Sequence, residues 1–253
     1  MPEPTSALPS KIATLPRYLA GAFVVAVCYF SAAWLGLTFA IPPGNATVVW
    51  PASGIAVGVL YLFGYRLWPA VWSGSCLVNL TTGVSFAVAS SFATGNTIEA
   101  IVAVWLLKRF LPDDAFKGAR DAFVFFLVAI TSCLPAATVG ALSMLLGGRI
   151  GTDDFGANWI TWLLGDLAGE VIIFPILLAL AARRWTPLTV ARLFELLLLF
   201  GLQVVLSFFL FGGLLPERLA EQVLYLPMVL LIWCSLRFGL VEVTAGTLPV
   251  SYT

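Results

Sequence analysis

Runs of about twenty apolar residues recur along the whole chain, and they constrain its fold more than any other feature. Of the 253 residues, 60% are hydrophobic and only 10% are charged, and the mean hydropathy is +1.00. Soluble domains have about 25% charged residues, whereas a helix of about 20 apolar residues crosses the hydrocarbon core of a bilayer. The sequence therefore predicts an all-α, polytopic transmembrane helical bundle of about eight spans, at residues 18–40, 46–64, 67–84, 86–107, 122–147, 157–182, 193–212 and 222–236.

The lysines and arginines are concentrated in every second loop. Eleven of the 13 lie at the N-terminus, in every second loop or after the eighth run, and only Arg149 and Arg218 lie in the other loops. Because basic loops stay in the cytoplasm, we expect a cytoplasmic N-terminus. The third run is a weak candidate for a membrane span, since it contains Asn79 and ends in threonine and glycine. It either crosses the membrane or re-enters on the same side. The regular alternation favours a crossing.

Three carboxylates lie deep inside apolar runs. The stretch "WITWLLGDLAGEVIIFP" (159–175) carries Asp166 and Glu170 one helical turn apart, near the middle of the sixth run. Glu99 lies at a similar depth in the fourth run, on the same face as Asn96. A charged aspartate at the bilayer centre costs roughly 2.5–3.5 kcal/mol. No lysine or arginine lies inside any run, so ion pairing cannot neutralise these acids.

The acids can be accommodated by protonation, by hydrogen bonds or by a bound cation or cationic ligand. A plainer interpretation is that polar side chains, including Gln203 in the seventh run, only hold helices together. Three acids without a basic partner exceed what packing requires, so we favour a ligand, ion or proton site. Its candidate ligand-binding residues are Asp166, Glu170, Glu99, Asn96, Trp50, Asn79 and Trp162.

Glycine and proline positions favour close helix contacts near the acids. Gly165 and Gly169 form one GxxxG pair, and Gly54 and Gly58 form another; such pairs let helices approach closely. A proline inside a span frees a carbonyl that needs another partner, which is tolerated beside protein or a water-filled cavity. The prolines within the runs are Pro51, Pro135, Pro175 and Pro227.

Several kinds of site are excluded or not indicated. The chain has no histidine, which excludes Ser-His triads and imidazole metal sites. The cysteines lack CxxC spacing, so we expect free thiols that pack as small hydrophobic groups; they are Cys28, Cys76, Cys133 and Cys234. Asp166 has no second aspartate in a facing run, as an intramembrane aspartyl protease would need. We expect no catalytic residues and no metal ligands, assign no cofactor, and expect no nucleic-acid partner.

Four segments in order resemble the first type of bacterial membrane-associated sensor (MASE) domain. They are "NATVVWPASGIAVGVLYLFGYRLWPAV" (45–71), "GNTIEAIVAVWLLKRFLP" (95–112), "RDAFVF" (120–125) and "WITWLLGDLAGEVIIFP" (159–175), and "LIWCSLRFG" (231–239) suits the end of that domain. The residues that match the family's motifs are Trp50, Pro51, Gly54, Asn96, Glu99, Ala100, Trp162, Gly165, Asp166 and Gly169.

The resemblance implies a sensory input domain of the bacterial inner membrane that regulates a cytoplasmic output enzyme of the histidine kinase or diguanylate cyclase type. We expect a cytoplasmic leader at 1–17, the sensor domain at 18–240, and the start of a truncated further helix or linker at 241–253. The expected partners are the lipid bilayer, the output enzyme and a second copy in a homodimer. The alternative is a small secondary transporter or solute-binding membrane subunit that uses the same acids for ion coupling.

Overall fold

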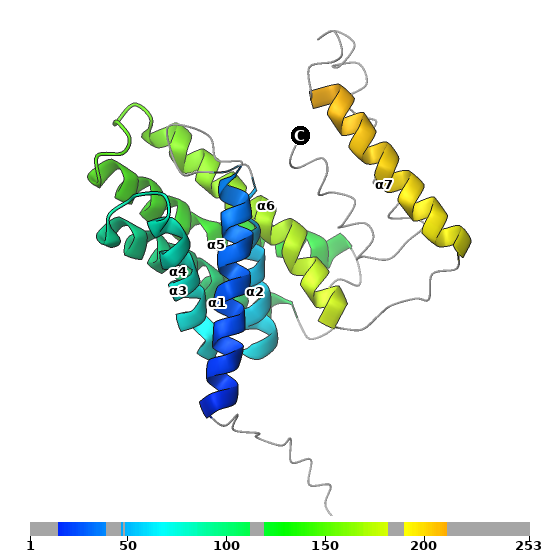
Figure 1. The fold of residues 1–253 in the computed structure, drawn as a ribbon, viewed down its shortest axis with the longest axis horizontal. Coiled ribbons are helices and arrows are strands. Elements are labelled where there is room, and N and C mark those ends of the chain that lie inside the picture. Colours follow the sequence, from blue (N-terminus) through cyan, green and yellow to red (C-terminus); the bar gives the residue numbers. More distant parts are fainter. Residues whose placement is uncertain (1–14, 39–46, 48, 112–118, 182–189, 212–253) are drawn as a thin grey trace, which may run out of the picture.

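The computed structural model describes residues 15–38, 47, 49–111, 119–181 and 190–211. Helices α1 to α6 gather in one bundle, and α7 stands apart from them (Figure 1). The elements described are all helices, which confirms the predicted all-α class. They are α1 (Leu15–Leu37), α2 (Pro51–Phe63), the short 3-10 helix η1 (Tyr65–Leu67), α3 (Trp68–Leu80), α4 (Phe86–Phe110), α5 (Ala119–Leu146), α6 (Phe155–Ala181) and α7 (Val190–Phe211).

Five of these helices are long and apolar enough to cross a membrane: α1, α4, α5, α6 and α7. The other two, α2 and α3, have 13 residues each, or about 20 Å of helix, which is shorter than the ~30 Å hydrocarbon core. The predicted run at 222–236 lies outside the described residues, so the count of about eight spans stays a prediction. The chain is a multi-pass membrane protein.

The outer faces of the bundle are apolar. Helix α1 buries one stripe, formed by Val25, Tyr29, Ala33 and Gly36, against its neighbours. Its opposite face exposes large apolar side chains, with Phe23 71% exposed. A helix that is apolar all round belongs in a core or in a membrane, so these exposed side chains are suited to contact lipid.

The second predicted span is a half-helix preceded by non-helical chain. The sequence predicts one helix over 46–64, but α2 begins only at Pro51, after non-helical backbone at Val49 and Trp50. Proline fits the first helical turn because it has no N–H to leave unpaired. The expectation that Pro51 interrupts a span is therefore wrong: it starts a helix. Pro135 and Pro175 do lie inside helices, α5 and α6, and Pro227 is outside the described residues.

The chain that enters α2 lies against α6. The Trp50 N–H donates to the Gly165 carbonyl of α6 at 2.8 Å, and Thr47, Val49 and Trp50 are all buried. Irregular backbone is tolerated at membrane depth where protein covers it. This contact satisfies the backbone and fixes the position of the N-terminus of α2.

The two GxxxG pairs lie in this contact. A methyl group on Gly169 would overlap the Trp50 carbonyl oxygen, and one on Gly54 would overlap the Gly169 carbonyl oxygen. A methyl group on Gly165 would overlap the Thr47 carbonyl oxygen. The predicted close approach is thus confirmed, and at Gly54, Gly165 and Gly169 it requires glycine because backbone atoms occupy the space of the missing side chains.

The bundle has two distinct ends. At one end, the Tyr18 hydroxyl donates to the Arg66 carbonyl at 2.8 Å, and the Lys108 ammonium lies 5.0 Å from the ring centroid of Tyr65. At the other end, the Arg149 guanidinium donates to the Thr82 carbonyl at 3.1 Å. Helix α3 connects these two ends of the bundle, and the crossing that the basic residues favour stays a prediction.

Four helices, α2, α4, α5 and α6, surround the centre of the bundle. Helices α2 and α5 each pack against both α4 and α6, and α1 packs against α2 and α3. Side chains of α4 and α6 that point inward therefore meet in the space between α2 and α5.

Candidate functional site

Three carboxyl groups meet at the centre of the bundle. Glu99 lies within one residue of the middle of α4, and Asp166 and Glu170 lie on either side of the middle of α6. All three are at most 1% exposed. The carboxyl of Glu99 is in hydrogen-bonding contact with those of Asp166 and Glu170. Glu99 and Asp166, which the sequence places at similar depth, therefore face each other across α4 and α6. We call these three residues the carboxyl cluster.

Hydroxyl and indole groups donate to the carboxyl cluster. The Ser53 hydroxyl donates to Asp166 Oδ1 at 2.8 Å and also contacts Glu99. The Ser132 hydroxyl is 3.3 Å from both carboxyl oxygens of Glu170. The Trp162 side chain hydrogen-bonds to Asp166, one turn further along α6. Ser53 lies in the first turn of α2, so the positive end of that helix dipole is near the acids.

A cysteine completes the group of side chains. The Cys133 side chain, near the middle of α5, hydrogen-bonds with Glu170. One ligand atom each from Glu99, Cys133 and Glu170 lies within 4.8 Å of the other two, and all three residues are buried. The sequence predicts that Cys133 only packs as a small hydrophobic group, and its place beside the acids was not predicted. Its depth in the fifth run, equal to that of the acids, was the available signal.

Two oxygens of the carboxyl cluster have no hydrogen-bond partner in the described part of the chain. Among the described residues, nothing hydrogen-bonds to the buried atoms Glu99 Oε2 and Asp166 Oδ2, although buried polar atoms are nearly always paired. The basic residues of α4, Lys108 and Arg109, lie in its last turn. Three charged acids at mid-bilayer would cost about 8–10 kcal/mol, as much as the stability of a typical domain. Such a cluster is neutralised by protons or by a bound cation.

A second polar network adjoins the carboxyl cluster. The Asn96 amide donates at 3.0 Å to the Tyr29 hydroxyl and at 3.0 Å to the Ser75 hydroxyl, and the Trp50 side chain hydrogen-bonds with Tyr29. Asn96 lies three residues before Glu99, and Trp50 lies three residues before Ser53. Helices α1, α3 and α4 and the chain before α2 are thereby joined beside the acids.

The predicted site residues thus separate into three groups. Asp166, Glu170, Glu99 and Trp162 lie together, and Asn96 and Trp50 lie in the adjoining network. The Asn79 amide instead donates to the Ser75 carbonyl of its own helix at 2.9 Å. Gln203 is on α7, which stands apart from the bundle (Figure 1).

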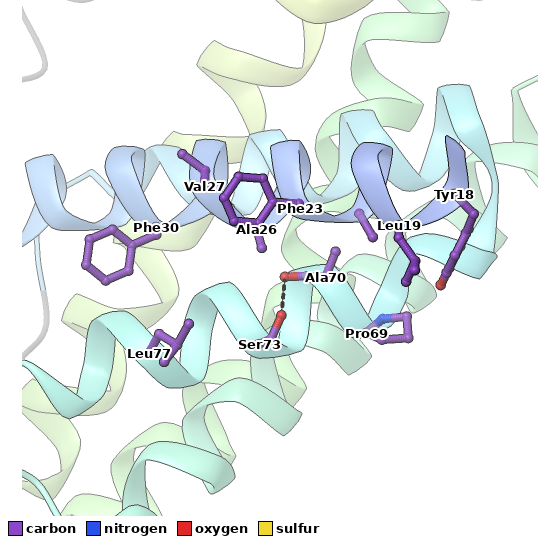
Figure 2. Close-up of a pocket in the computed structure, with 11 residues that line it drawn as sticks. Tyr18, Leu19, Phe23, Ala26, Val27, Phe30, Pro69, Ala70, Ser73 and Leu77 are labelled. Atoms are coloured by element: carbon purple, nitrogen blue, oxygen red, sulfur yellow. Dashed lines mark hydrogen bonds between the residues drawn. The ribbon is translucent and has the colours of Figure 1, made fainter. Parts of the chain in front are cut away.

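A groove between α1 and α3 is of a different kind (Figure 2). Its wall is apolar apart from the hydroxyls of Tyr18 and Ser73, each of which donates to a backbone carbonyl. No polar group of this wall calls for a ligand. The residues that line the groove are Tyr18, Leu19, Ala22, Phe23, Ala26, Val27, Phe30, Pro69, Ala70, Ser73 and Leu77.

Comparison with known proteins gives one match. The sequence profile of the family MASE1 matches residues 20–248, nearly the whole chain. No curated protein and no solved structure matches it. The match spans all six helices of the bundle and the segments whose motifs resemble this family. The chain therefore belongs to the MASE1 family and is a membrane sensory input domain.

Proposed function

We propose that residues 18–240 sense a ligand or proton through the carboxyl cluster and regulate a cytoplasmic enzyme that lies outside this chain. The output is of the histidine kinase or diguanylate cyclase type, and the domain works as a homodimer in the bacterial inner membrane with its N-terminus in the cytoplasm. Membership of the MASE1 family supports the sensory role. The eleven-to-two division of basic residues supports the orientation.

The carboxyl cluster carries this proposal. Three buried acids contact one another, two of their oxygens have no partner in the described part of the chain, and the basic side chains of the described helices lie near helix ends. Polar groups that only hold helices together would pair with each other. An unpaired acidic centre favours a group that binds and leaves.

Helix α2 is suited to carry the signal. Ser53 in its first turn bridges Asp166 and Glu99, and η1, at its other end, lies where Tyr18 meets Arg66. Binding at the cluster changes what Ser53 contacts and so shifts α2 against the glycines of α6. Such a shift reaches the end of the bundle that we propose faces the cytoplasm.

The test joins this chain to a diguanylate cyclase and compares its output in wild type, Glu99→Gln, Asp166→Asn and the double variant. The amides keep size and hydrogen-bonding capacity but cannot ionise, so we expect regulated output to be lost while insertion is retained. Asp153→Asn, in an exposed loop, is the control. Full regulation in the double variant would reduce the acids to structural contacts.

A transporter is the second candidate, and the broken span supports it. Secondary transporters place interrupted helices at mid-membrane, with half-helix N-termini near their ion sites. The start of α2 beside Asp166 has this geometry. Purified protein in liposomes distinguishes the two: ion or solute uptake that Asp166→Asn abolishes would favour transport over sensing.

Orientation is tested with two single cysteines in a background without native cysteines. Thr152→Cys is in the exposed loop between α5 and α6, and Ala115→Cys is in the basic loop between α4 and α5. A membrane-impermeant thiol reagent added outside should label the first only. Labelling of Ala115→Cys in intact cells would reverse the proposed topology.

A further inference from the structure

The geometry points to a transition-metal site at the carboxyl cluster, with Glu99, Cys133 and Glu170 as ligands for an ion of the Zn²⁺ type. The inference rests on the proposed function, because it names the class of ligand that the cluster takes. The sequence predicts no metal ligand, because Cys133 is expected only to pack as a small hydrophobic group.

Three helices each supply a donor at the same depth. The ligand atoms of Glu99 on α4, Cys133 on α5 and Glu170 on α6 lie within 4.8 Å of one another. Tetrahedral Zn²⁺ with bonds of about 2.0–2.3 Å sets its ligands roughly 3.3–3.8 Å apart. Side-chain rotations that move the ligand atoms by about an ångström would therefore let all three bind one ion.

Asp166 lies beside these three donors and can supply a fourth. Asp166 is 1% exposed, its carboxyl contacts that of Glu99, and its Oδ2 atom has no hydrogen-bond partner among the described residues. Glu99 Oε2 is unpaired in the same way. These oxygens have lone pairs that no protein group in the described part of the chain occupies, and a bound cation would do so.

Charge also favours a divalent ion. Side chains near the cluster contribute carboxyl, thiol, hydroxyl and indole groups, and basic residues of the described helices are near helix ends. A divalent cation bound by the Cys133 thiolate and one ionised carboxyl, with the other carboxyls protonated, gives a neutral centre, which suits the middle of a bilayer.

The thiol selects the kind of metal. Thiolates favour Zn²⁺ and similar ions, whereas Mg²⁺ and Ca²⁺ take oxygen ligands and usually more of them. The Cys133 side chain hydrogen-bonds with Glu170, so the sulfur and this carboxyl are close enough to bind the same ion. We therefore expect Zn²⁺ to bind and Mg²⁺ not to compete.

The experiment uses the full chain, purified in detergent and freed of metal, with Cys28→Ser and Cys234→Ser to remove two other thiols. Co²⁺ serves as the spectroscopic probe. One equivalent should give a thiolate-to-cobalt charge-transfer band and tetrahedral d–d bands, and Zn²⁺ but not Mg²⁺ should displace it. Absence of these bands in this otherwise unaltered protein would overturn the inference, whatever the variants do.

The matched pair of variants is Cys133→Ser and Cys76→Ser, since both cysteines are buried and only Cys133 is among the three donors. Cys133→Ser should abolish the charge-transfer band and weaken Zn²⁺ binding by at least about tenfold; Cys76→Ser should change neither. Glu170→Gln should weaken binding while keeping the sulfur band. Equal binding by Cys133→Ser and wild type would contradict the site.

The outcome separates this inference from the proposed function. If metal does not bind but the Glu99 and Asp166 amides still abolish regulation, the metal site falls and sensing at the cluster stands. If Zn²⁺ binds with one-to-one stoichiometry but output ignores both the metal and the amides, the site stands and the sensing proposal falls.

Discussion

The carboxyl cluster and the groove between α1 and α3 are two regions of one bundle with opposite properties. The groove is hollow, apolar and open, and its hydroxyls donate to nearby carbonyls (Figure 2). The cluster is closed and polar, and two of its buried oxygens have no hydrogen-bond partner among the described residues. Lipid chains fill an apolar groove without specific partners, whereas unpaired buried oxygens require one. In this membrane protein, unsatisfied polar atoms locate the site better than the shape of the surface does.

We expect the largest difference in stability between the two regions when one methyl group is added to a glycine in each. Gly169→Ala places it on the Trp50 carbonyl, and because backbone must move, we expect a loss of about 3 kcal/mol in the free energy of unfolding. Gly21→Ala, on α1 beside the groove, meets nothing within 4 Å and should gain up to about 1 kcal/mol. Thermal unfolding in detergent measures both; equal effects would break the comparison.

A pair of serines gives the next largest difference. Ser53→Ala removes the 2.8 Å donor to Asp166 and should cost about 1.5–3 kcal/mol if that carboxyl is ionised, as hydrogen bonds to charged groups do. Ser73→Ala removes only a bond to a carbonyl of its own helix and should cost at most about 0.5 kcal/mol. Chemical denaturation of both variants measures the free energy of unfolding. A loss for Ser73→Ala as large as that for Ser53→Ala would contradict this prediction.

Two tyrosines of α1 give the smallest difference. Tyr29→Phe deprives the buried Asn96 amide of one acceptor and should cost about 1–2 kcal/mol. Tyr18→Phe removes a bond at the exposed end of the groove, where water can replace it, and should cost about 0.5 kcal/mol. The same unfolding measurement applies, and the prediction fails if Tyr18→Phe proves the more costly change.

The fold class was predictable because hydropathy alone reports what lipid requires. The long helices follow the predicted runs, and the depths of Glu99 and Asp166 implied that they could meet. Helix length was not predictable for α2, because the apolar residues Val49 and Trp50 suit either conformation, and their non-helical backbone depends on the contact with α6. Only the packed structure shows that Gly165 accepts the hydrogen bond from Trp50.

The other members of the site were harder to predict, for a different reason. A cysteine or serine in an apolar run costs little to bury, so Ser53 and Ser132 gave no signal in the sequence, and the only signal from Cys133 was its depth in the fifth run. An acid costs far more, and each buried acid did give one. Asn79 also gave a signal, but it does not belong to the site, since its amide donates a hydrogen bond within its own helix.

A double-mutant cycle on Glu99 and Asp166 tests most directly whether the acids act as one unit. The free energy of unfolding is measured for Glu99→Gln, Asp166→Asn, the double variant and wild type. Because the two carboxyls touch, we predict a coupling energy of about 1 kcal/mol or more. The control cycle pairs Glu99→Gln with Asp153→Asn and should be additive within about 0.5 kcal/mol. An additive Glu99–Asp166 cycle would contradict a carboxyl cluster at the centre of the bundle.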